Sequence, residues 1–174
     1  MLYALRAHLP TAWLIQVLAL TAVFAAVVLV EVYPAVSAWL APLNVAIAGL
    51  TAALIDWLGM AVAWEASVLY HPTGFGYEIG AACTGLVPAL VVIATLCCLP
   101  LRANQRLLAI GLGVLFTQGI NLVRLVVLYY IGVHYPSSFD LAHDWLGQGL
   151  IIVTTALFII FWIRTSGRAM RQSL

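Results

Sequence analysis

The sequence predicts an all-α integral membrane protein, a compact helical bundle of four to five membrane helices with a short extracytoplasmic hairpin. Three observations lead to this fold class. The 174 residues are 65% hydrophobic and only 7% charged, whereas roughly 25% of the residues in an ordinary soluble domain are charged. Five apolar stretches approach the roughly 20 residues that a helix needs to cross the hydrocarbon core of a bilayer. Short polar connections separate these stretches.

The five apolar stretches cover most of the chain. No repeat, linker or low-complexity segment between them indicates a second domain, so we expect residues 1–174 to form a single transmembrane domain. The first stretch is too long for a signal-peptide core and has no convincing cleavage site, so we expect it to be retained as a helix. The stretches are Thr11–Val32, Ala38–Leu58, Cys83–Leu99, Leu107–Ile131 and Trp145–Ile163.

Charge and cysteine content argue against two other classes of protein. The net charge is only +1, which is too small to indicate a nucleic-acid partner. The cysteines are odd in number, and Cys97 and Cys98 are adjacent, so a disulfide framework is not expected. Cys83 therefore needs a separate explanation.

The placement of arginine predicts which helix ends face the cytoplasm, because short cytoplasmic loops are enriched in Lys and Arg. Arg102 and Arg106 mark one cytoplasmic loop, and three arginines in the C-terminal tail mark a second cytoplasmic segment. The loop from Gly132 to Asp144 contains two aspartates and no arginine, so we expect it outside. The helix beginning at Cys83 then runs inward from the outer face, and the next one returns outward.

One apolar stretch conflicts with this orientation. If Arg6 places the N-terminus inside, two full spans before residue 60 would leave the chain inside, just before a helix that must start outside. The stretch Ala38–Leu58 contains a proline, an asparagine and an aspartate, so we expect it to be re-entrant or to lie along the outer interface. An outside N-terminus is the alternative. The first interpretation leaves four true spans.

The segment Met60–Ala82 has a different pattern from its neighbours. The sequence His71-Pro72-Thr73-Gly74 is typical of a turn, and Phe75, Tyr77 and Ile79 then alternate with glycine and glutamate. This pattern predicts a short hairpin on the outer surface. Because unpaired backbone groups are not tolerated in lipid, we expect the hairpin to lie in the headgroup layer or to cover the helix bundle.

Arg124 is the most informative single residue, because ionisable groups inside membrane segments are costly and usually functional. Thr117, Asn121 and Arg124 follow the spacing i, i+4, i+7, which places three polar side chains on one helical face. We expect this face to point into the bundle. The alternative is a structural Arg124 that pairs with an acid such as Asp56 or Asp140.

Cys83 and His143 are weaker signals when each is taken alone. Cys83 stands at the predicted outer start of a helix, where the helix N-terminus would favour the thiolate that acts as a nucleophile; the alternative is a small buried apolar residue. His143 stands just before the last predicted helix, where a histidine is usually a solvated loop residue.

Together the three residues form a stronger pattern. The predicted orientation places Cys83, Arg124 and His143 at the outer ends of three different helices, although Arg124 was not used to orient any loop. A thiolate nucleophile, an imidazole that can protonate a leaving amine and a cation that can stabilise an oxyanion are the groups that acyl transfer requires.

The sequence resembles the exosortase/archaeosortase family of membrane transpeptidases, and its length resembles the short exosortase-H-like group. The segment Ala82-Cys83-Thr84-Gly85 is close to the Ala-Cys-Ser-Gly signature of that family, with Thr84 in place of the commoner serine. Asn121-Leu122-Val123-Arg124 matches its Asn-x-x-Arg motif, and His143 stands four residues before Gly147. The resemblance covers about residues 54 to 163.

The resemblance implies a sorting enzyme of the cytoplasmic (inner) membrane with an extracytoplasmic active site. Its substrates would be exported proteins with a C-terminal motif, transmembrane helix and basic cluster, and its acyl acceptor is not identified by the sequence. Cys83 would form a thioester, His143 would be the general acid and base, and Arg124 would stabilise the oxyanion. No metal or organic cofactor is implied, and membrane lipid is the other expected partner. Supporting or substrate-binding roles are expected for Asn121, Thr84 and Asp140.

Two other functions fit part of the pattern. A small transporter or assembly subunit would use Arg124 in a polar pathway or to bind an anionic lipid headgroup, and it would tolerate Cys83→Ala. A thiol oxidoreductase would need two cysteines within bonding reach, but Cys97 is 14 residues from Cys83, roughly 21 Å along a helix. The group that orients His143 stays open between three acids, Asp140, Asp144 and Glu78.

Overall fold

The computed structural model describes residues 18, 21–22, 25, 38–99 and 101–172. The predicted helix Thr11–Val32 lies almost wholly outside these residues. In chain order the main elements are α3 (Ala41–Trp57), β1 (Ala63–Glu65), β2 (Val68–Tyr70), β3 (Gly76–Glu78), α4 (Leu86–Cys97), α5 (Ala103–His134), α6 (Phe139–Leu141) and α7 (Gln148–Gln172). Three short helical turns lie between them, η1 (Ala81–Cys83), η2 (Pro136–Ser138) and η3 (Ala142–Gly147).

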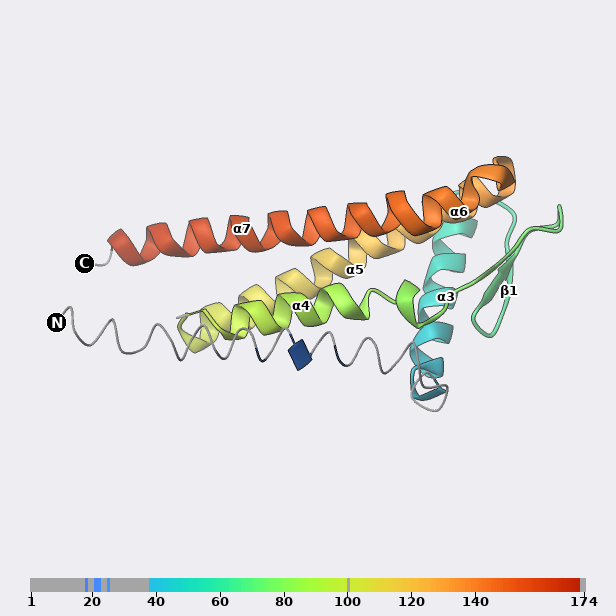
Figure 1. Ribbon diagram of the computed structural model, residues 1–174. Helices are drawn as coiled ribbons and strands as arrows, with labels where there is room; N and C mark the ends of the chain where they lie inside the picture. Colours follow the sequence, from blue (N-terminus) through green and yellow to red (C-terminus); the bar gives the residue numbers. More distant parts are fainter. Residues whose placement is uncertain (1–17, 19–20, 23–24, 26–37, 100, 173–174) are drawn as a thin grey trace.

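Helices α4, α5 and α7 pack against one another and form the bundle. Figure 1 shows the three running side by side, with the turn between α4 and α5 and the C-terminus at one end and the sheet, α3 and α6 at the other. Val92, Leu96 and Ala109 are buried between these helices, and Phe158 and Trp162 pack against them. This cluster of buried side chains fills the bundle away from the sheet.

The described helices differ in whether they are long enough to cross a bilayer. The helix α5 and the segment Pro136–Thr165 are both long and apolar enough, by length and composition. The other two apolar helices are shorter, with 17 residues in α3 and 12 in α4. At 1.5 Å per residue α4 is only about 18 Å long, less than the roughly 30 Å of the hydrocarbon core. The described residues therefore contain two helices of spanning length, where four to five membrane helices were predicted for the whole chain.

Helix α3 lies across the end of the bundle instead of alongside it (Figure 1). Its buried residues are Ile47, Ala48, Thr51, Ala52 and Ile55, which fall on one face of the helix. The opposite face is exposed and carries Trp57. This one-sided packing across the bundle agrees with the expectation that Ala38–Leu58 is not a full membrane span.

The predicted hairpin is part of a three-stranded antiparallel sheet with the order β1-β2-β3. Its turn lies where the sequence predicted it, because the backbone N–H of Gly74 donates to the carbonyl of His71 and the N–H of His71 donates to that of Phe75. Tyr77 and Ile79 are buried, as alternation along a strand requires. Strand β1 was not predicted, because all three of its residues are exposed and show no alternation.

Tyr129 of α5 connects the sheet to the bundle. Its ring is fully buried. Its hydroxyl is shared as a donor between two carbonyl oxygens, that of Ala61 at 2.9 Å and that of Tyr70 at 3.1 Å. Phe75 packs edge-on against the Tyr129 ring and lies directly over Gly132 of α5. The sheet is therefore held on the C-terminal turns of α5 by a phenol and an aromatic ring.

This packing predicts that Gly132→Ala destabilises the protein. A Cβ at Gly132 would overlap the Phe75 ring, which Tyr129 and Phe139 hold in place, and overpacking of this kind typically costs about 1–3 kcal/mol. Gly119→Ala in the same helix meets open space, so it should be neutral or slightly stabilising. Thermal unfolding in detergent should show a lower midpoint for Gly132→Ala only. Equal midpoints for the two variants would contradict this packing.

Candidate active site

The sequence predicted that Cys83 begins the following helix, but in the structure it does not. It is the last residue of η1, and α4 starts three residues later at Leu86. Gly85 causes the break, because its φ of +71° belongs to the left-handed region, which cannot continue a right-handed helix. The predicted position of the thiol at the first turn of a long helix is therefore wrong. The thiol is instead buried in a bend, where it is 4% exposed.

Two predicted supporting residues hold the Cys83 bend in place. The hydroxyl of Thr84 donates to the carbonyl of Ala81 at 2.8 Å and accepts from the N–H of Leu86 at 3.3 Å. It thus joins η1 to the first turn of α4. The side-chain amide of Asn121 donates to the carbonyl of Cys83 at 2.8 Å. Any Cβ at Gly85 would come within 3.1 Å of the Asn121 side chain, so a glycine lets α5 approach this closely.

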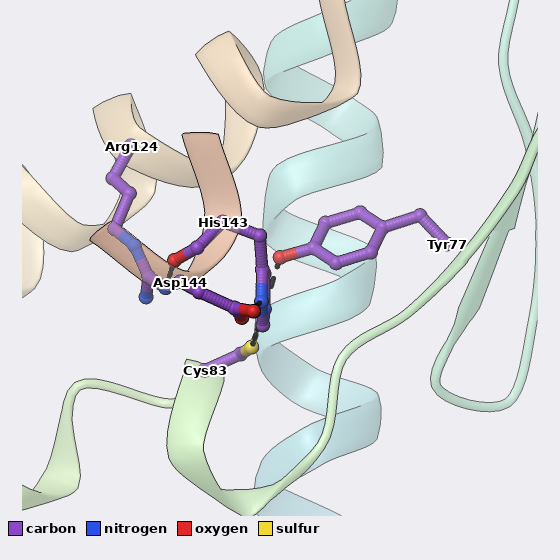
Figure 2. Close-up of polar contacts among 5 residues, drawn as sticks. All are labelled: Tyr77, Cys83, Arg124, His143 and Asp144. Carbon is purple, nitrogen blue, oxygen red and sulfur yellow. Dashed lines mark hydrogen bonds and ion pairs between the residues drawn. The ribbon is translucent and has the colours of Figure 1, made fainter. Parts of the chain in front are cut away.

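His143 lies next to the thiol. Its Nε2 is 3.4 Å from Sγ of Cys83, although the two residues are 60 positions apart in the chain. His143 belongs to η3, a π-helical turn, and such turns occur frequently at functional sites. The structure thus brings together the thiol and the imidazole that the sequence selected (Figure 2).

Asp144 is the acid beside His143. Its Oδ1 lies 2.8 Å from Nδ1 of His143. Asp140 and Glu78 are exposed, and their carboxylates make no hydrogen bond or ion pair within the described part of the chain. A carboxylate at Nδ1 favours the tautomer with hydrogen on that nitrogen, which leaves Nε2 free to accept a proton from the thiol. Among the described residues, no hydrogen bond or ion pair of the Asp140 carboxylate supports the role expected for it.

Arg124 is 3% exposed, and its Nη2 donates to the backbone carbonyl of His143 at 3.4 Å. A Cβ at Gly147 would lie 2.5 Å from Nε of Arg124, so this glycine makes room for the guanidinium. Among the described residues, no carboxylate forms an ion pair with Arg124, and its Nε has no hydrogen-bond partner. The pairing with Asp56 or Asp140, considered as a structural alternative, is therefore not observed.

The predicted polar stripe on α5 is buried as expected. Thr117, Asn121 and Arg124 are each no more than 3% exposed. They differ in their contacts, because the hydroxyl of Thr117 donates back to carbonyls of its own helix at Gly113 and Val114. Asn121 and Arg124 instead donate to the backbone of Cys83 and of His143.

Tyr77 belongs to this site, but the sequence analysis did not select it. Its hydroxyl donates to Sγ of Cys83 at 3.7 Å, and its ring lies edge-on to the His143 ring. Burial raises the pKa of Tyr77 well above its usual range, and the neighbouring Cys83 adds to that rise. The phenol therefore stays protonated at neutral pH and remains a donor. The alternation in β3 placed Tyr77 on a buried face, but it could not show that this face meets Cys83.

The arrangement has the groups that an acyl transfer needs. It contains a thiol in contact with an imidazole, a carboxylate on the far side of that imidazole, a buried guanidinium and a phenol donor (Figure 2). Among the described residues, no group of three His, Cys, Asp or Glu could hold a metal ion.

The contact between His143 and Cys83 makes a prediction about thiol reactivity. His143→Ala should slow alkylation of Cys83 by iodoacetamide roughly tenfold at neutral pH, because the thiolate is the reactive form and the variant lacks the proton acceptor. The rate can be followed by mass spectrometry with Cys97 and Cys98 replaced by serine. His134→Ala is the matched control, since that histidine is exposed and its ring lies against Tyr130 in α5, away from Cys83. Equal rates in the two variants would contradict a functional contact.

Comparison with known proteins gives one match. The family model described as Transmembrane exosortase (Exosortase_EpsH) matches residues 3–162, which is most of the chain, and it confirms the resemblance drawn from the three motifs. Searches of curated proteins and of solved structures found no match. The chain belongs to the transmembrane exosortase family.

Proposed function

We propose that this chain is a membrane-embedded cysteine transpeptidase that cleaves C-terminal sorting signals of exported proteins through a thioester on Cys83. The observation that carries the proposal is the distance of 3.4 Å between Sγ of Cys83 and Nε2 of His143. Membership of the exosortase family supports the reaction class.

In the first half-reaction, Nε2 of His143 takes the proton of the Cys83 thiol, and the thiolate attacks the scissile carbonyl carbon. A C–S bond forms and the carbonyl oxygen becomes an oxyanion. When the tetrahedral intermediate collapses, the C–N bond breaks and His143 returns its proton to the leaving amine. The substrate remains as a thioester on Cys83.

In the second half-reaction, an acceptor nucleophile attacks the thioester carbonyl. His143 removes a proton from the acceptor, the C–S bond breaks, and the sulfur regains the proton. Asp144 accepts from Nδ1–H of His143 and stabilises the imidazolium that forms twice in the cycle. The acceptor can be an amine or water, which decides between transfer and hydrolysis.

Two donors are available for the oxyanion. The guanidinium of Arg124 is buried, and its Nε has no partner among the described residues. A charged donor stabilises an oxyanion most where water is excluded. The Tyr77 hydroxyl already points at Sγ, so it can donate to the thiolate and, after attack, to the adjacent oxyanion.

We assign the site to the extracytoplasmic side of the membrane. Arg102 is the N-cap residue of α5, and Arg124 lies 22 residues later in the chain. That is roughly 33 Å along the helix axis, about the thickness of the hydrocarbon core. If the arginine loop at Arg102 is cytoplasmic, Arg124 lies near the outer face. The topology predicted from the sequence, with four spans and Ala38–Leu58 along the outer interface, gives cytoplasmic positions to both Arg6 and the C-terminal tail.

Three substitutions test the mechanism. Cys83→Ala, His143→Ala and Arg124→Ala should each reduce cleavage of a co-expressed protein with a motif–helix–basic tail by at least a hundredfold, because each removes a reacting or charge-stabilising group. Cleavage is measured by immunoblot, and membrane levels of the variants should match the unaltered protein. Cys97→Ala should cleave normally, since this thiol is at the far end of α4.

The same set of variants separates this function from a transporter or assembly subunit. A non-enzymatic protein that uses Arg124 to bind anions would lose function with Arg124→Ala but keep it with Cys83→Ala. Normal processing by Cys83→Ala would therefore refute the thioester mechanism.

Tyr77→Phe tests the phenol donor. The substitution keeps the ring and its packing against Phe139 but removes the hydrogen bond to Sγ, so we expect kcat to fall about tenfold to a hundredfold. Tyr130→Phe, at an exposed position of α5, is the matched control and should be unchanged. A processing rate for Tyr77→Phe equal to that of the control would show that the hydroxyl has no part in the reaction.

A further inference from the structure

A cavity of about 510 Å³ lies beside the Cys83 bend. Its walls come from α4, through Val87 and Val91, and from α7, through residues between Gln148 and Ile159. Ala82 and Gly85, on either side of Cys83 in the chain, line one end. We call this cavity the α4–α7 groove.

The groove is polar where it meets the site and mainly apolar beyond it. Asn121 and Arg124 line it together with Ala82 and Gly85, whereas most of the other lining residues are aliphatic. Along α7 it extends from Gln148 to Ile159, 11 residues or roughly 16 Å of helix axis. The groove therefore starts at the residues that flank the proposed nucleophile and continues along α7 toward the opposite end of the bundle.

Two residues that line the groove each carry a buried polar atom that lacks a partner within the described residues. Nε of Arg124 has no acceptor, and the hydroxyl of Thr155, a residue only 6% exposed, has no hydrogen bond. Buried donors without acceptors are costly. Both residues line the groove, so an occupant with hydrogen-bond acceptors would remove this cost once the two donors turn toward it.

We propose that the α4–α7 groove binds the residues that directly follow the cleavage site in the substrate, at the start of its apolar tail segment. This inference rests on the proposed function. A substrate whose scissile carbonyl lies at Sγ of Cys83 must continue from there into the bilayer, and the groove leads from Cys83 in that direction. Its peptide carbonyls can accept from Arg124 and Thr155, while its apolar side chains contact the aliphatic walls.

The chemistry and size of the groove favour a short peptide segment over other occupants. The acyl chain of a lipid has no acceptor for the Thr155 hydroxyl. A volume of about 510 Å³ lies within the range of ligand pockets, roughly 300–1,000 Å³, and suits a few residues rather than a whole membrane helix. Ile152 lines the groove and is 67% exposed, so the groove is open on one side and a membrane segment can enter from the bilayer.

Disulfide cross-linking in membranes tests the proposal directly. Cys83→Ala, with Cys97 and Cys98 replaced by serine, gives a cysteine-free protein that cannot cleave its substrate. Ala156→Cys is added in the groove, and the co-expressed substrate carries single cysteines at successive positions after the cleavage site. Copper phenanthroline should cross-link Ala156→Cys to one or two of the first positions of the tail.

Leu157→Cys is the matched control, because Leu157 is the next residue, is 59% exposed and does not line the groove. Equal cross-linking of Ala156→Cys and Leu157→Cys, or none in either, would overturn the proposal. So would a cross-link from Ala156→Cys to a cysteine placed within residues 11–32 of the same chain, since that segment would then fill the groove.

A filling substitution in the active protein distinguishes this proposal from the proposed function itself. Ala156→Trp should reduce substrate cleavage at least tenfold, while alkylation of Cys83 by iodoacetamide stays within about twofold of the unaltered protein. Normal cleavage by Ala156→Trp, with cleavage still abolished in Cys83→Ala, would overturn the groove assignment and leave the thioester mechanism intact.

Discussion

Two hydrogen bonds from one face of α5 determine the geometry of the site. Asn121 donates to the backbone carbonyl of Cys83, and Arg124, three residues later, donates to that of His143. Lipid cannot solvate an amide or a guanidinium, so both side chains must turn inward and find acceptors there. The acceptors they find belong to the backbones of the two residues whose side chains meet at 3.4 Å. The cost of polar groups in a membrane therefore holds a thiol and an imidazole together.

This arrangement explains several irregular features of the chain. Helix α4 starts late because Gly85 turns left-handed and lets Asn121 approach. The chain around His143 widens into a π-helical turn, and Gly147 in that turn leaves space for Arg124. Irregular backbone is tolerated at membrane depth only where protein or water covers it. Here the irregular segments pack on α5 and on the sheet at the end of the bundle.

Much of the site could be predicted from the sequence, because charged and polar side chains are costly in lipid and must therefore face the interior of the bundle. The periodicity around Arg124 indicated an inward face, and the arginine loops predicted that Cys83, Arg124 and His143 lie at the same end of the bundle. The turn at His71–Gly74 followed from its proline and glycine. The expectation that Ala38–Leu58 does not span the membrane followed from its polar residues. It also followed from the number of spans needed to bring the chain to the outer side before Cys83.

The remaining features depend on tertiary contacts that the sequence pattern does not encode. Gly85 has a left-handed backbone conformation, so α4 starts at Leu86 and not at Cys83. The hydrophobic periodicity of the sequence does not indicate such a break. Asp140, Asp144 and Glu78 were equally good candidates until the π-helical turn brought Asp144 to Nδ1 of His143. Tyr77 was recognisable as a buried strand residue, but the residue that its hydroxyl meets is set by how the sheet packs on the bundle.

The central claim is that the sulfur of Cys83 becomes covalently acylated during turnover. The most direct measurement is mass spectrometry of the purified protein after incubation with a substrate peptide in the absence of an acceptor amine. The account predicts an adduct of the substrate's N-terminal fragment on Cys83 that hydroxylamine releases. Turnover of the peptide with no adduct on Cys83, or with the adduct on another residue, would contradict it.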